Sequence, residues 1–74
     1  MSVARVTEIS STSTKSFDDA VQVGIARATK TLRNVRSAWI KEQQVNLDGN
    51  GNVNSYQVNM LITFVLDDSA DAGA

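Results

Sequence analysis

Cysteine and histidine are both missing from this 74-residue chain. Without cysteine, disulfides and thiolate metal sites are excluded. Without histidine, the chain lacks the commonest transition-metal ligand and the commonest general base. A chain of this length is near the lower limit of what one hydrophobic core can stabilise, and such domains usually add disulfides, a metal or oligomerisation. Of these three means of stabilisation, oligomerisation is the one that this composition leaves open.

The chain also lacks a strong excess of charge and a long apolar run. Its net charge is −1 and its pI is about 5.0, so no strong field attracts nucleic acid or an anionic membrane. Residues 1–5 do not resemble the start of a signal peptide, and no apolar run approaches the ~20 residues that a bilayer requires. We therefore expect a soluble, cytoplasmic protein with no nucleic-acid or membrane partner.

Groups for catalysis and for metal binding are scarce. The sequence contains no nucleophile–base pair, no glycine-rich phosphate loop and no carboxylate pair at a meaningful spacing, so we do not expect an enzyme. Segment 48–52 superficially resembles the start of an EF-hand loop but lacks its glycine at position six and its glutamate at position twelve. Asp67 and Asp68 are expected to be solvated charges of the tail. No metal site is predicted.

A basic run accompanies the predicted helix and leaves two interpretations open. Its members are Arg27, Lys30, Arg33 and Arg36. They either form a solvated face that complements the helix dipole or bind a phosphate-bearing ligand.

The pattern of apolar residues predicts an α+β fold with the order β-α-β-β, in which a three-stranded antiparallel sheet wraps on one helix. The expected elements are a strand at 3–10, a helix from 17 to about 34, and strands at 35–47 and 53–66. Segment 48–52 is rich in glycine and asparagine and predicts a hairpin between the last two strands. The polar stretch 41–44 is expected to hold a bulge or to be solvated. One domain is expected over 3–68, followed by a loose acidic tail over 69–74.

The predicted helix has recognisable ends and one apolar stripe. Ser13 and Ser16 are both candidates for its N-cap, and Asn34 is a plausible stop. The stripe is formed by Phe17, Val21, Gly24, Ile25, Ala28 and Leu32. Gly24 and Ala28 would let a strand approach the helix closely.

The last strand is apolar on both faces. One face is expected to cover the helix and carries Tyr56, Val58, Met60, Ile62, Phe64 and Leu66. The opposite face nevertheless includes Leu61 and Val65, which is typical of a strand buried on both sides. A single helix covers only one face of a sheet, so a second copy of the chain is the simplest cover for the other. This pattern predicts self-association.

Three residues are candidates for a ligand site. Trp39 is the only tryptophan, and it is either an interface or core aromatic or a flat wall on which an aromatic ligand stacks. Ser37 shares its face of the predicted strand. Gln57 either faces water in a cavity or pairs across the sheet, or else its amide forms hydrogen bonds with the polar edge of a ligand.

Several stretches taken together resemble the dodecin family. They are RVTEI at 5–9, STS at 11–13, ARATKTLRNV at 26–35, YQV at 56–58 and FVLD at 64–67. The resemblance implies a hollow sphere of twelve subunits, with sheets inside and helices outside. It also implies that flavins are bound in pairs between a tryptophan and a glutamine.

The chain departs from the family pattern at the site. Gln57 matches the family glutamine, but Ser37 occupies the tryptophan position, and Trp39 lies where the family commonly has glutamate. Gln44 and Val65 occupy positions at which many bacterial members carry arginine.

These observations predict a non-catalytic homododecameric shell that sequesters a small aromatic ligand, flavin-like, such as riboflavin, FMN or lumichrome. Trp39 would stack, Gln57 would bond the ring's polar edge and Ser37 would line the site. The alternative is a flavin-free assembly that holds ions or phosphorylated ligands, as the serine at position 37 suggests. A monomeric module that offers residues 61–65 to a different protein is a third interpretation.

Overall fold

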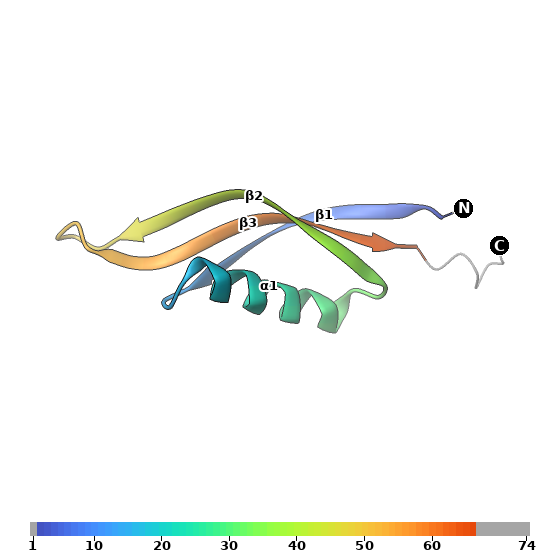
Figure 1. Ribbon diagram of the computed structural model, residues 1–74, viewed down its shortest axis with the longest axis horizontal. Helices are drawn as coiled ribbons and strands as arrows, with labels where there is room; N and C mark the ends of the chain where they lie inside the picture. The colour runs from blue at the N-terminus through green and yellow to red at the C-terminus, as the bar shows by residue number, and fades with distance from the viewer. Residues whose placement is uncertain (1, 67–74) are drawn as a thin grey trace.

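The computed structural model of the protein describes residues 2–66. The elements are β1 (Ala4–Ser13), α1 (Phe17–Thr31), β2 (Val35–Leu47) and β3 (Val53–Val65) (Figure 1). The three strands form one antiparallel sheet, so the predicted β-α-β-β fold is confirmed. The predicted tail at 69–74, and Asp67 and Asp68 before it, lie outside the described residues.

Strand β3 is the centre of the sheet. The strand order is β1-β3-β2, and β3 pairs antiparallel with both neighbours, for example through Met60 with Ile9 of β1 and with Ile40 of β2. A central strand contacts neighbours on both edges and is sheltered more than an edge strand. This position accounts for its richness in apolar residues.

Hydrogen bonds of two serines fix the start of α1. The hydroxyl of Ser16 is the N-cap and accepts a hydrogen bond of 2.9 Å from the backbone N–H of Asp19. Ser13 does not cap the helix. Its hydroxyl accepts from the backbone N–H of Lys15 at 2.9 Å and donates to the Asp19 carboxylate at 2.6 Å, which fixes the loop before the helix.

The helix ends at Thr31, three residues before the predicted stop. The backbone N–H of Leu32 still donates to the carbonyl of Ala28, but Leu32 itself has an extended backbone. Asn34 then adopts a φ of 61°, the left-handed conformation that asparagine tolerates well. Asn34 therefore shapes the turn into β2 rather than the last turn of the helix.

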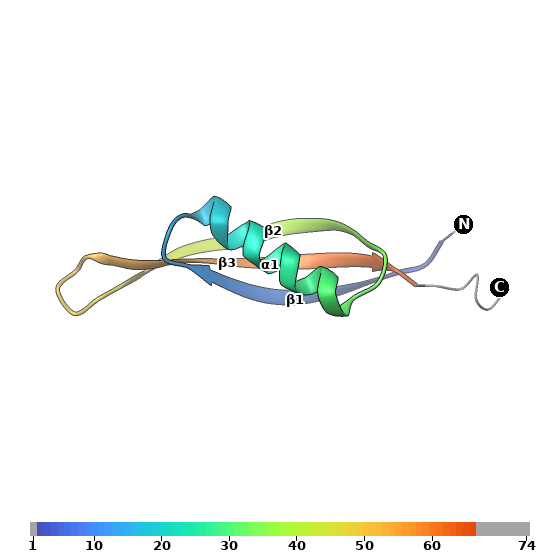
Figure 2. The same ribbon diagram turned by 90° about the horizontal axis from the view of Figure 1, so that it is seen from below.

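The helix crosses one face of the sheet, as Figure 2 shows, and the core lies between the two layers. The buried apolar side chains are Ala20, Ala28, Val58, Met60 and Ile62. At Gly24 the layers approach so closely that a Cβ atom would lie 2.9 Å from Cβ of Ser11 and would also collide with the methyl group of Met60. A side chain at position 24 is therefore excluded by packing.

The β2–β3 hairpin extends beyond the N-terminal end of the helix (Figure 1). Asp48 orders its turn, because its carboxylate accepts hydrogen bonds from the backbone N–H groups of Asn52 and Asn50. These bonds, that of Asn52 first, hold the pKa of Asp48 below its usual value. We call the projecting part, residues 45–55, the arm. Its apolar residues Val45, Leu47 and Val53 are exposed.

Candidate functional site

The sheet face that points away from α1 carries all three predicted site residues, and we call it the open face. Val58, Met60 and Ile62 are buried under the helix, so the intervening residues of β3 lie on the open face. The register places Ser37 beside Thr63, Trp39 beside Leu61, and Gln44 beside Gln57. Ser37, Trp39 and Gln57 therefore share one surface.

The open face has two chemically different halves. The apolar half is nearer the start of β1 and comprises Ala4, Val6, Ser37, Trp39, Leu61, Thr63 and Val65. The polar half is nearer the arm and comprises Ser10, Thr12, Glu42, Gln44, Asn46, Ser55, Gln57 and Asn59. In the apolar half, Trp39 is 66% exposed and Val6 is 56% exposed. Exposed apolar side chains grouped in this way are typical of an interface or a ligand site.

The side-chain amide of Gln57 is the centre of a hydrogen-bond network in the polar half. Its nitrogen donates to Ser10 Oγ at 3.0 Å and to Asn59 Oδ1 at 3.3 Å. Its oxygen accepts from Asn46 at 3.3 Å and from Gln44 at 3.5 Å. The network thus joins all three strands, and pairing of Gln57 across the sheet is what the structure shows.

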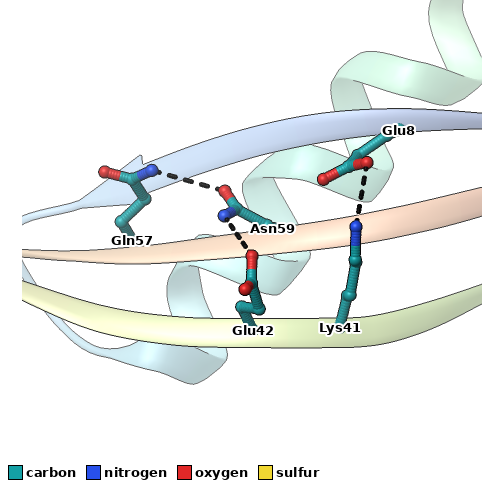
Figure 3. Close-up of polar contacts among 5 residues, drawn as sticks. All are labelled: Glu8, Lys41, Glu42, Gln57 and Asn59. Carbon is teal, nitrogen blue, oxygen red and sulfur yellow. Dashed lines mark hydrogen bonds and ion pairs between the residues drawn. The ribbon is translucent and has the colours of Figure 1, made fainter.

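A bulge in β2 adds charge to this face. Ile40 pairs with Met60 and Glu42 pairs with Asn59, so Lys41 is an extra residue in β2. This confirms the irregularity expected in the polar stretch at 41–44. Figure 3 shows that Lys41 and Glu42 lie on the same face as Gln57 and Asn59.

The bulge residues make two contacts on this face, one across the central strand to β1 and one with β3 itself. The ammonium group of Lys41 lies 3.4 Å from the carboxylate of Glu8 on β1, and this ion pair marks the boundary between the two halves. Glu42 accepts a hydrogen bond of 3.1 Å from the amide nitrogen of Asn59. The bulge therefore places one cation and one anion in the middle of the open face.

Trp39 and Gln57 do not touch within one chain. The partner of Trp39 on β3 is Leu61, four residues and roughly 13 Å from Gln57 along the strand. Glu42 and Asn59 lie between them. A planar ligand on Trp39 would therefore reach this intervening pair first.

The network around Gln57 is larger than the sequence reasoning identified. Ser10, Glu42, Gln44 and Asn46 were not among the predicted site residues. The period-2 spacing of polar residues at 42, 44 and 46 on one strand, and at 55, 57 and 59 on the next, is the signal that could have found them.

A groove lies on the other side of the molecule, between β1 and α1. Its volume is about 530 Å³, and it includes Ile9, Gly24 and Arg27 among its lining residues. Arg27 donates a hydrogen bond of 3.3 Å to Thr31. The groove contains none of the predicted site residues. Arg27 and Lys30 belong to the helix and thus not to the open face.

The part of the chain that the structure describes contains neither a cluster of side chains for a metal ion nor a helix that could span a membrane. Residues 2–66 bring together no group of three or more acidic, histidine or cysteine side chains that could hold a metal ion. Within the same range, the helix is too short and too polar to cross a membrane.

Comparison with known proteins gives a consistent result. The family model described as Dodecin matches residues 3–67. Among solved structures, the dodecin from Streptomyces davaonensis is 36% identical, with 89% of this chain and 96% of that chain covered and a TM-score of 0.84. The tt0972 protein from Thermus thermophilus is 33% identical, with 90% and 97% covered and a TM-score of 0.82.

A third similar structure is described as a protein that binds calcium. The calcium dodecin from Mycobacterium tuberculosis, described as a calcium-chelating antigen with a novel calcium-binding site, is 28% identical. The match covers 92% of this chain and 96% of that chain, with a TM-score of 0.79. No curated protein sequence matches.

Proposed function

This chain belongs to the dodecin family, and from that premise we propose that it forms a non-catalytic, cytoplasmic homododecamer that sequesters a small aromatic ligand of the flavin class. Riboflavin, FMN and lumichrome are the members of this class that we consider. The observation that carries the proposal is the composition of the open face, where an exposed indole lies beside a network of amides.

The apolar half supplies the surface for the flat ring system. Trp39 is 66% exposed and its neighbour across the strand is Leu61, so the indole presents a large apolar surface. Aromatic rings stack favourably on such a surface. Ser37 occupies the adjacent position on β2 and, being small, leaves room beside the indole. The edge of the ring would then extend over the amide network centred on Gln57.

Assembly is supported by the exposed arm. Val45, Leu47 and Val53 have no helix above them, and a domain of this size gains stability when such residues are buried against other copies. A closed, symmetric oligomer buries them in every subunit. Twelve subunits are proposed because that is the number implied by the family.

A second candidate function is a flavin-free assembly that holds ions or phosphorylated ligands. It is favoured by Ser37 at the family's tryptophan position and by the calcium dodecin among the similar structures. A yellow colour that stays with the purified protein would count against it.

Replacement of Trp39 by alanine tests the ligand site. Loss of one stacking ring costs about 1–3 kcal/mol, so we expect riboflavin affinity to fall by roughly 5- to 150-fold. Quenching of riboflavin fluorescence on titration with protein measures the change. Trp39→Phe is the matched control, because it keeps an aromatic surface and should retain most of the affinity. Unchanged affinity in the alanine variant would show that Trp39 does not stack on the ligand.

A further inference from the structure

We propose that the polar half of the open face selects an uncharged flavin over a phosphorylated one, and that Glu42 is the residue that determines this preference. The inference rests on the proposed function, because it concerns the ligand of the same site. The inference is based on the donor and acceptor atoms that the network around Gln57 leaves available to a ligand, and on the charges beside them.

Gln57 has no hydrogen-bonding capacity to spare. A side-chain amide has two N–H donors and an oxygen with two lone pairs. In Gln57 the nitrogen donates to Ser10 and Asn59, and the oxygen accepts from Asn46 and Gln44. The amide is thus occupied within the sheet, and its role is to position its neighbours for the ligand.

The unused atoms of the network are mainly oxygens. The Gln44 nitrogen donates to Asn46 and Gln57, whereas its oxygen has no partner among residues 2–66. Glu42 uses Oε1 to accept from Asn59, and its Oε2 has no hydrogen-bond partner in the same range. Asn59 retains one N–H, since the only bond its nitrogen makes within the described chain is to Glu42. A ligand that meets these atoms is held best by donating hydrogen bonds.

The charge of this region has the same sign as a phosphate. Lys41 lies at the boundary, and its ammonium group is already paired with Glu8 at 3.4 Å. Within residues 2–66, the cation next to Glu42 on the open face is therefore already paired, and Glu42 is the carboxylate that an incoming ligand meets. The basic residues of α1 lie in the other layer of the fold, and Arg36 follows Val35 at the far end of β2.

These features fit the flavin ring and oppose its phosphate. A neutral ring with an imide N–H can donate to Glu42 or Gln44 while a ring carbonyl accepts from Asn59. A phosphate monoester carries a charge of about −1.5 to −2 at pH 7, and the carboxylate of Glu42 repels it. Such a repulsion reduces affinity by roughly tenfold when the charges are about 10 Å apart at an effective dielectric constant near 40, between the values for a protein surface and for bulk water.

The test is a pair of fluorescence titrations of the assembled protein, with riboflavin and with FMN, at low salt. We expect riboflavin to bind about tenfold more tightly than FMN, and the ratio to shrink as added salt screens the repulsion. Glu42→Gln keeps the shape of the side chain and should reduce the ratio to roughly threefold or less. Asp18→Asn is the matched control: it removes one exposed negative charge from the helix, and it should leave the ratio unchanged.

Each other outcome has a distinct meaning. If both flavins bind and FMN binds as tightly as riboflavin or more tightly, the proposed selection is wrong while flavin sequestration stands. If riboflavin is preferred equally by the wild-type protein and by Glu42→Gln, Glu42 does not determine the preference. If neither flavin binds, the proposed function fails together with the inference.

Discussion

Replacement of Met60 by alanine is expected to remove about half of the free energy of unfolding of the isolated chain. Met60 is fully buried at the centre of β3, between Ile9 and Ile40 of the neighbouring strands, and its methyl group packs against Gly24 of the helix. Removal of a buried methionine side chain costs about 2–5 kcal/mol. A domain of this size has a free energy of unfolding of only about 4–11 kcal/mol.

Circular dichroism during urea unfolding measures this loss. We expect the midpoint of the Met60→Ala variant to fall to roughly half of the wild-type value. Met60→Leu is the control, because it nearly conserves volume and should cost less than about 1.5 kcal/mol. An alanine variant with a wild-type midpoint would contradict the placement of Met60 in the core.

Replacement of Leu47 by aspartate is expected to abolish assembly. Leu47 is 58% exposed on the arm and pairs with Val53, which is also exposed, so the substitution removes little from the core of its own chain. In an oligomer that buries the arm, however, each copy would bury an unpaired carboxylate at the interface. A charge buried without a partner costs several kcal/mol, and a symmetric assembly repeats that cost at every interface.

Size-exclusion chromatography with light scattering measures the mass of this variant. We expect a species of one or a few chains in place of the large assembly. Asn50→Lys is the control, because it introduces a charge at the tip of the same arm without removing an apolar side chain. If Leu47→Asp retains the full assembly, the arm is not an interface.

The fold could be predicted because its determinants are local. The bounds of β2 were predicted to the residue, since Asn34 and Asp48 mark its two ends with left-handed backbone and a tight turn. The apolar run of the last strand predicted a strand that is apolar on both faces, and its central place in the sheet came from the structure. Strand β1 extends three residues further than predicted, to Ser13. The serine and threonine run that favours turns pairs instead with residues 56–59 of β3. The end of β1 is therefore determined by its pairing with β3, a strand that is distant in sequence.

The site could be predicted only in part, for a similar reason. Period-2 alternation places Ser37 and Trp39 on one face, and this was confirmed. Their distance from Gln57 depends on the register between β2 and β3 and on the bulge at Lys41, neither of which a single sequence reveals. The neighbours that saturate the amide of Gln57 come from all three strands, and only the assembled sheet brings them together.

Sedimentation velocity at several wavelengths, on purified protein with added riboflavin, tests the central claim most directly. The proposed shell predicts one boundary near 96 kDa, the mass of twelve chains of 8.0 kDa, with the flavin absorbance moving in that boundary. A boundary of that mass from which the flavin absorbance is absent would contradict flavin sequestration and leave the assembly intact. A boundary at the mass of one chain would contradict the shell itself.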